Sequence, residues 1–252
     1  MGEIITIVNQ KGGVGKTTTA VNLTAALTAL GKKILLCDFD PQSNASSGLG
    51  IARSKQKGST YDMILGKKTA AEITVHTKYG DVLPSSGALS GASVELVDME
   101  RREYCLKDAL LPVKSQYDYI FIDCPPSLEL LTLNGLCAAD RLLIPVQCEY
   151  FALEGLSDLM VTLRAVKRNL NPTIEIFGVL LTMFDGRTNF SLQVAEEVRK
   201  HFPGKVFATV IPRNVRLAEC PSHGLPVTAY DRFSKGAIAY KKLADEFVER
   251  NL

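Results

Sequence analysis

The residues with the clearest chemistry form a glycine-rich segment near the beginning of the chain, Lys11-Gly-Gly-Val-Gly-Lys-Thr-Thr18. Glycines between a strand and a helix let backbone N–H groups point at a phosphate, and the positive end of the helix dipole adds to the attraction. In such a loop Lys16 reaches the terminal phosphates and the Thr17 hydroxyl binds Mg²⁺. The residues expected to bind the nucleotide here are Lys11, Gly12, Gly13, Val14, Gly15, Lys16, Thr17 and Thr18.

This loop departs from the usual phosphate loop, because Gln10 stands where a glycine is expected five positions before Gly15. A second lysine, Lys11, stands at its beginning instead. One lysine suffices to bind a nucleotide, so the second predicts an additional role. The simpler alternative is a glycine turn whose lysine binds no ligand. The strand pattern before the segment and the helical pattern after it favour a phosphate loop instead. A dinucleotide-binding turn is also less favoured, because Thr18 occupies its third glycine position and Asp38 is the only ribose-binding candidate.

Carboxylates follow two other apolar segments. Asp123 ends a strand-like run, where a carboxylate is costly unless it is solvated or paired with a cation. Mg²⁺ held by Thr17, with Asp123 behind a coordinated water, would satisfy it. Asp38 and Asp40 follow an earlier strand-like run that Pro41 ends. Strand-end turns are the ordinary explanation for such residues, but the phosphate loop favours a role in its chemistry.

The elements that must position these residues alternate along the chain. Several apolar segments are continuous, which is typical of parallel strands covered on both faces. The expected strands are Ile4–Val8, Lys33–Cys37, Val82–Leu83, Tyr119–Ile122, Leu142–Val146, Ile174–Leu181 and Val206–Ile211. The expected helices lie near residues 18–30, 94–113, 151–169, 189–202 and 235–250. This alternation predicts an α/β fold with a mostly parallel, doubly wound sheet flanked by helices.

Such a sheet binds ligands at the carboxyl ends of its strands, so the loop, Asp40 and Asp123 are expected to gather there. Residues 48–80 show no regular strand or helix pattern, which predicts a surface segment within the same domain. Doubly wound sheets often reach 252 residues as one unit, so residues 1–252 are expected to form a single domain.

The composition excludes several classes of protein. None of the six cysteines forms a C-x-x-C pair, which disfavours zinc and thioredoxin-type sites. Reduced thiols of a cytosolic protein are the better explanation. No apolar run reaches the roughly 18 residues of a membrane span. The first strand begins near residue 3 and leaves no room for a signal peptide. We therefore expect a cytoplasmic protein without a membrane span.

Four segments together resemble the ParA/MinD family of ATPases with a deviant Walker A box. Besides the glycine-rich loop, Cys37-Asp-Phe-Asp-Pro-Gln42 looks like switch I. Phe121-Ile-Asp-Cys-Pro-Pro-Ser127 looks like the Walker B strand with switch II. Val210-Ile-Pro-Arg-Asn-Val-Arg216 looks like the late segment near the base and DNA. The four span residues 11 to 216, and the likeness is strongest to the chromosomal ParA proteins called Soj. The resemblance implies a P-loop NTPase fold with ATP and Mg²⁺ as cofactors.

The resemblance also implies roles for individual residues. Asp40 would be the catalytic carboxylate that activates water, and Asp38 would support the Mg²⁺ and its water network. Lys11 would reach the partner's nucleotide across a dimer interface and act there with Lys16, much as an arginine finger does. Gly12 would let the two loops approach each other.

Pro212 and Met183 are the residues expected near the adenine base. Phe184, next to Met183 after the sixth expected strand, is a further candidate. The resemblance favours Pro212, whereas core or loop packing explains Met183 and Phe184 at least as well.

The resemblance implies that an ATP-dependent homodimer binds DNA non-specifically on the nucleoid, and that a ParB-like protein stimulates slow hydrolysis. Residues 183–242 carry a net charge of +5, while the whole chain carries +2. The candidate DNA contacts are Arg187, Lys200, Lys205, Arg216, Arg232 and Lys235. Alignment supports Arg187 and Arg216; the others rest on charge, for which a solvated surface is the ordinary explanation.

Two alternatives share the fold. A MinD-type membrane ATPase needs a basic amphipathic terminal helix, but residues 243–252 contain three acids and one base. An iron–sulfur reductase subunit needs cysteines at the subunit interface, and Cys124 has no convincing second cysteine near it in the sequence.

Overall fold

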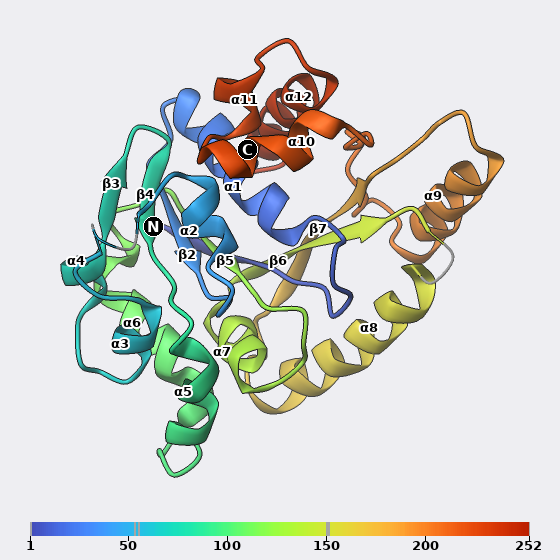
Figure 1. The fold of residues 1–252 in the computed structure, drawn as a ribbon. Helices are drawn as coiled ribbons and strands as arrows, with labels where there is room; N and C mark the ends of the chain where they lie inside the picture. The colour runs from blue at the N-terminus through green and yellow to red at the C-terminus, as the bar shows by residue number, and fades with distance from the viewer. Residues whose placement is uncertain (1, 53, 55, 150–151, 252) are drawn as a thin grey trace.

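The computed structural model describes residues 2–52, 54, 56–149 and 152–251. At its centre these residues form a seven-stranded sheet in the order β3-β4-β2-β5-β1-β6-β7 (Figure 1). The strands are β1 Glu3–Ile7, β2 Ile34–Asp38, β3 Val75–Thr77, β4 Gly80–Leu83, β5 Tyr119–Asp123, β6 Arg141–Gln147 and β7 Glu175–Thr182. Neighbouring strands are parallel except at the edge, where β3 pairs antiparallel with β4.

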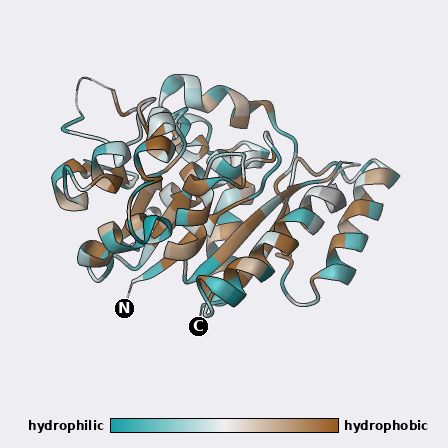
Figure 2. Cartoon of the chain, turned by 90° about the horizontal axis from the view of Figure 1, so that it is seen from below, coloured by the Kyte–Doolittle hydropathy of each residue, from teal (hydrophilic) through white to brown (hydrophobic). Residues whose placement is uncertain are grey.

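Helices cover both faces of this sheet (Figure 1). The helices of the described residues are α1 Lys16–Ala29, α2 Asn44–Gly48, α3 Thr60–Ile64, α4 Ala70–Ile73, α5 Leu89–Glu95, α6 Cys105–Lys114, α7 Leu130–Ala138, α8 Ala152–Asn169, α9 Asn189–His201, α10 Val215–Glu219, α11 Val227–Tyr230 and α12 Lys235–Glu249. One apolar cluster joins α1 and α12 to the sheet, and two others pack against α6 and against α7 to α9. Figure 2 shows hydrophobic residues on the strands and hydrophilic residues on the outer helix surfaces.

The predicted α/β architecture is correct, and six of the expected strands are present within one or two residues of their predicted ends. The expected strand Val206–Ile211 is wrong. This segment runs beside β7, with Phe207 N donating to Val179 O at 2.9 Å and Ile211 N to Leu181 O at 2.9 Å. Between them, the N–H groups of Ala208 and Thr209 donate to the carboxylate of Glu246, each at 2.8 Å. The Glu246 side chain of α12 therefore binds N–H groups of this segment in place of strand-to-strand hydrogen bonds, and no continuous strand forms.

The single helix expected near residues 94–113 is also wrong, because α5 ends at Glu95 and α6 begins at Cys105. Arg101 between them has a φ of 56°, which a continuous helix does not allow. Residues 48–80 are more regular than expected. The helices α3 and α4 each begin with a capping box, Ser59 with Asp62 and Thr69 with Glu72. The expected helix 151–169 is present from Ala152, and residue 151 lies outside the described residues.

Candidate nucleotide and magnesium site

The glycine-rich loop leaves the central strand β1 and enters α1, which begins at Lys16. Gly13 and Gly15 have φ values of 77° and 90°, in the left-handed region that favours glycine. A Cβ on Gly15 would also lie 3.6 Å from the side chain of Thr182. The loop therefore has the backbone geometry that a phosphate cradle requires.

Two polar residues that the sequence analysis did not single out hold this loop in place. Asn9 is buried, donates from Nδ2 to Pro145 O at 2.8 Å and accepts from Lys11 N at 3.0 Å. The Thr182 hydroxyl donates to Val14 O at 2.8 Å. These bonds tie the loop to β6 and β7. The signal in the sequence was a polar residue at the end of each strand-like run.

Lys16 lies buried beneath the loop, with only 6% of its surface exposed. Its Nζ donates to Lys11 O at 3.0 Å. Burial lowers the pKa of Lys16, whereas the nearby carboxylates of Asp123 and Asp40 raise it. An ammonium group so placed has further hydrogens for a phosphate oxygen. Lys16 therefore lies where it could reach a phosphate held by the loop, and its role in binding ATP stays a prediction.

Asp123 is fully buried at the end of β5, and neither of its carboxylate oxygens has a hydrogen-bond partner among the described residues. Burial, and next the charge of Asp38, raise the pKa of Asp123 well above its ordinary value. The nearby Thr17 hydroxyl opposes this rise, although it does not meet the geometry of a hydrogen bond to the carboxylate. An unpaired buried carboxylate beside a threonine hydroxyl fits a magnesium ion, which prefers oxygen ligands.

Asp38 and Asp40 are engaged differently. Asp38 is fully buried, and its Oδ2 accepts from the Ser46 backbone at 2.7 Å and the Ser46 hydroxyl at 2.6 Å. Burial raises the pKa of Asp38 to about 6. Asp40 accepts from Gln42 N at 2.9 Å through Oδ1. Asp38 therefore anchors α2, which favours a supporting role, while Asp40 lies nearer to solvent.

Within the described residues, no three His, Cys, Asp or Glu side chains are grouped tightly enough to hold a metal by themselves. A magnesium ion would therefore need the Thr17 hydroxyl and the oxygens of the nucleotide in addition to Asp123.

Lys11 lies on the outer side of the loop, with its Nζ 3.5 Å from Glu149 Oε2. Arg213 Nη2 lies 3.6 Å from the other oxygen of Glu149. Gly12 has no close neighbour: a Cβ there would come no nearer than 3.9 Å to Pro126 Cβ. Nothing within the described part of one chain therefore requires glycine at this position.

Comparisons with known proteins agree with this geometry. A family model described as an AAA domain matches residues 2–176. The sporulation initiation inhibitor protein Soj of Bacillus subtilis is 56% identical over 98% of each protein. The chromosome partitioning protein ParA of Myxococcus xanthus is 53% identical over 100% of this chain and 89% of its own length. The chain belongs to the ParA/MinD family of P-loop ATPases.

The fold of this ParA/MinD-family chain is also similar to that of a solved structure. Cobyrinic acid a,c-diamide synthase from Mycobacterium smegmatis, with a bound ATP analogue and magnesium, superposes with a TM-score of 0.87 at 37% identity. The match covers 97% of this chain and 93% of that one. The fold is thus that of a P-loop NTPase.

The two residues predicted to lie near the base, Met183 and Pro212, come from the position directly after β7 and from a later segment that runs beside it. Phe184 N donates to Ile211 O at 3.0 Å, and Phe184 forms an isolated bridge with Pro212. Met183 has a φ of 49° and is half-buried. A cavity of about 420 Å³ beside this bridge is lined by Phe184, Asp185, Gly186, Arg187, Pro212, Arg213 and Lys235. The structure therefore joins the two predicted base segments, although Met183 does not line the cavity.

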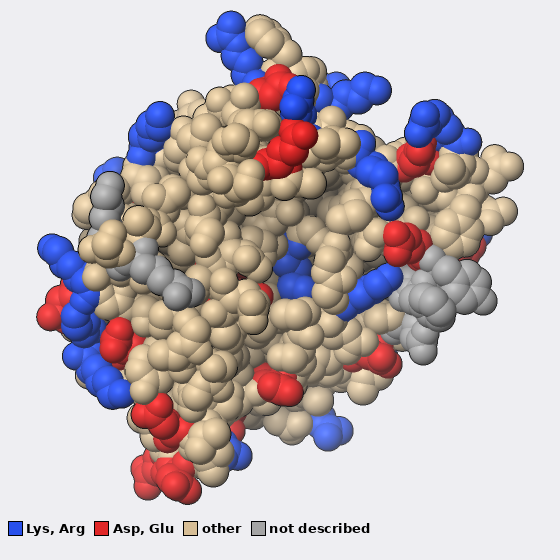
Figure 3. All heavy atoms as spheres, in the orientation of Figure 1, with Lys and Arg blue, Asp and Glu red and all other residues tan. Residues whose placement is uncertain are grey.

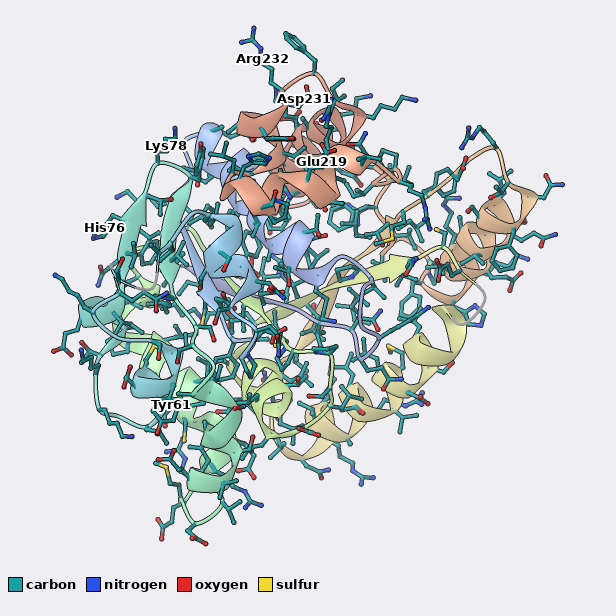
Figure 4. All side chains as sticks on the ribbon, in the orientation of Figure 1. Tyr61, His76, Lys78, Glu219, Asp231 and Arg232 are labelled. Atoms are coloured by element: carbon teal, nitrogen blue, oxygen red, sulfur yellow. The ribbon has the colours of Figure 1, made fainter. Side chains whose placement is uncertain are left out.

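The six candidate DNA contacts divide into two groups. Arg187, Lys200 and Arg216 form ion pairs with acidic neighbours. Lys205, Arg232 and Lys235 have no ion pair among the described residues. Figure 4 shows Arg232 pointing away from the body of the molecule, and its guanidinium lies over the Phe233 ring at 4.6 Å. Arg187 and Lys235 share the cavity beside Pro212, whereas no single pocket holds all six.

Proposed function

We propose that this chain is a ParA-type, Soj-like ATPase that partitions chromosomes or plasmids. It binds Mg-ATP and hydrolyses it to ADP and phosphate. One observation carries this proposal: the unpaired, buried carboxylate of Asp123 lies beside the buried Lys16 and the hydroxyl of Thr17. Mg-ATP supplies the cation and the phosphates that these groups lack.

The residues act by positioning and by charge. Lys16 and the loop N–H groups bind the phosphates, and Thr17 with Asp123 holds Mg²⁺. Asp40 orients the attacking water, and Asp38 fixes the backbone that carries Asp40 through the bond from Asp40 N at 3.4 Å. The base lies against Pro212, next to Met183. Phosphoryl transfer needs little more from a protein.

The nucleotide also controls assembly. Lys11 lies at the outer side of the loop, and Gly12 leaves space that none of the described residues of the same chain fills. We infer that a second copy approaches here when ATP is bound, so that Lys11 leaves Glu149 and binds the partner's nucleotide. The ATP-bound state is a nucleotide-sandwich homodimer.

The dimer binds DNA through phosphate contacts, without preference for sequence, and is found on the nucleoid in the cytoplasm. The net charge of +5 in residues 183–242 supports this mode, and pairing two copies doubles it. Figure 3 shows basic side chains over the upper and right parts of one face. A ParB-like protein stimulates hydrolysis, which resets the switch.

A MinD-type membrane function is less supported. The apolar face of α12 is buried: Tyr240 and Phe247 are at most 1% exposed. The Tyr240 hydroxyl lies 3.2 Å from that of Thr19, and the Phe247 ring packs edge-on against Tyr119. The face of α12 that carries these two rings is therefore not available to lipid, and Ile238 is the large apolar side chain of the described part of this helix that remains exposed. No helix of the described residues is long and apolar enough to span a membrane.

The test compares wild type with Lys16→Ala, Lys11→Ala and Asp40→Ala by calorimetry with Mg-ATP and by light scattering. Lys16→Ala should lose ATP affinity. Lys11→Ala should bind ATP and stay monomeric, and Asp40→Ala should accumulate as a dimer. Sedimentation with duplex DNA or with anionic liposomes then separates the two functions. Liposome binding without DNA binding at low salt favours the MinD-type alternative.

A further inference from the structure

The basic segment 183–242 uses all of its acidic side chains to neutralise its own cations. Its acidic residues are Asp185, Glu196, Glu197, Glu219 and Asp231. All of them lie within ion-pair distance of the same three cations, Arg187, Lys200 and Arg216. The two arginines that alignment favours as DNA contacts are therefore among the most compensated charges of the segment.

The pair formed by Arg187 has two parallel hydrogen bonds. Its Nε and Nη2 donate to the two oxygens of Asp185 at 2.9 and 2.7 Å. The backbone N–H of Arg187 adds a third bond at 3.1 Å. These hydrogen bonds hold the pKa of Asp185 well below its ordinary value, so the acid remains charged. The Arg187 side chain is 89% exposed, yet its charge is already matched.

Arg216 lies between two acids. Its Nη1 donates to Glu219 at 2.8 Å, and its Nε lies 3.3 Å from Asp231. The hydroxyl of Tyr230 donates to the same oxygen of Glu219 at 3.3 Å. Figure 4 shows Glu219 and Asp231 in the same part of the molecule, beside α10 and α11, and Figure 3 shows acidic and basic side chains mixed there.

We propose that Asp185, Glu219 and Asp231 limit the DNA affinity of one subunit, so that useful binding requires two. This inference rests on the proposed DNA-binding function. An arginine that exchanges a carboxylate for a DNA phosphate loses one anion as it gains another, and the freed carboxylate repels the phosphates. The net gain per subunit is small. Only the doubled surface of the dimer then binds tightly, so the acids make DNA binding depend on ATP.

The test neutralises two acids while keeping their shape, in the double variant Asp185→Asn with Glu219→Gln. Asp231 is left unchanged because it also accepts from Phe233 N and caps the turn before α12. Binding to a fluorescent duplex is measured by anisotropy with and without ATP over a range of salt. Without ATP, the variant should bind roughly three- to tenfold more tightly than wild type. Its log–log salt dependence should steepen by about 0.9 for Arg187, and by less for Arg216, which keeps Asp231 as a partner.

A matched control changes the same total charge elsewhere, in Asp98→Asn with Glu100→Gln, two exposed residues beyond α5. This control should bind DNA as wild type does, and ATP affinity should be equal in all three proteins. Equal gains in the control and the test variant would mean that net charge alone acts, which overturns the inference. The inference is also overturned if the test variant has the same DNA affinity and the same salt dependence as wild type. If no protein binds DNA with ATP at low salt, the proposed DNA-binding function itself fails.

Discussion

Asp38 of β2 and Asp123 of β5 are register partners at the last positions of neighbouring strands, and neither side chain is exposed. Two buried carboxylates side by side oppose each other's ionisation, and burial opposes the ionisation of both. The nearby cation is Lys16, whose own charge is disfavoured by burial. The sheet therefore holds a costly charge arrangement at its carboxyl edge, which a divalent cation would relieve.

Asp123→Asn should stabilise the nucleotide-free protein and weaken binding of Mg-ATP. The amide removes the repulsion with Asp38 without the penalty of a buried charge, so the melting temperature should rise. The same change removes the anionic partner of Mg²⁺, and ATP affinity should fall by at least about tenfold. Calorimetry in Mg²⁺ and in EDTA checks this: EDTA should weaken ATP binding in wild type and change it little in the variant.

An exposed acid provides the control for that experiment. Asp98→Asn should change neither the melting temperature nor the effect of EDTA, because Asp98 forms no ion pair among the described residues. A destabilised Asp123→Asn protein that still binds Mg-ATP with wild-type affinity would contradict the assignment.

Asp38 should make the stability of the nucleotide-free protein fall as pH rises from about 4 to 6. Its pKa is about 6 when folded and 3.8 otherwise, so in this window the native state binds more protons than the unfolded state. The free-energy penalty of burying the Asp38 charge is absent below pH 3.8 and complete above about pH 6. The free-energy penalty is about 3 kcal/mol, from a rise of roughly two pKa units. Urea unfolding of wild type and Asp38→Asn across this range checks it, since parallel curves would exclude Asp38 as the cause.

The sequence predicted the parts of the fold and site that depend on local pattern. The continuous apolar runs indicated the parallel strands, and the glycines with Lys16 and Thr17 indicated the phosphate loop. Asp123 was identifiable because a carboxylate at the end of such a run needs a partner. These are properties of short segments, which neighbouring residues determine.

What the sequence missed depends on contacts between distant residues. The 206–211 segment has strand-like residues, but Glu246 binds its N–H groups from 37 and 38 positions away. Thr182 supports the loop across 168 positions. The ion pair of Arg216 with Asp231 depends on the fold around α10 and α11, whereas its pair with Glu219 is local to α10. No local pattern specifies such pairings.

Thr182→Val should weaken nucleotide binding through the loop that Thr182 supports. Its hydroxyl is the hydrogen-bond donor to Val14 O, so the isosteric valine leaves a buried loop carbonyl unpaired. We expect a loss of about 1–3 kcal/mol in the free energy of unfolding and a lower ATP affinity. Thr132→Val is the matched control, because the buried Thr132 hydroxyl has no hydrogen-bond partner. The control should be neutral or stabilising, and equal effects of the two substitutions would refute the argument.

Gly12→Val should separate ATP binding from dimerisation. Among the described residues of one chain, a Cβ at residue 12 meets nothing closer than 3.9 Å, and Gly12 is not among the glycines with positive φ. The folded monomer and its ATP affinity should therefore be close to wild type. Two loops that approach each other have no room for the added side chain, so light scattering with ATP should find a monomer. Gly87→Val, at another open and exposed glycine, should dimerise normally. A Gly12→Val dimer with ATP would place the interface elsewhere, and loss of ATP binding would mean that Gly12 serves the cradle of its own chain.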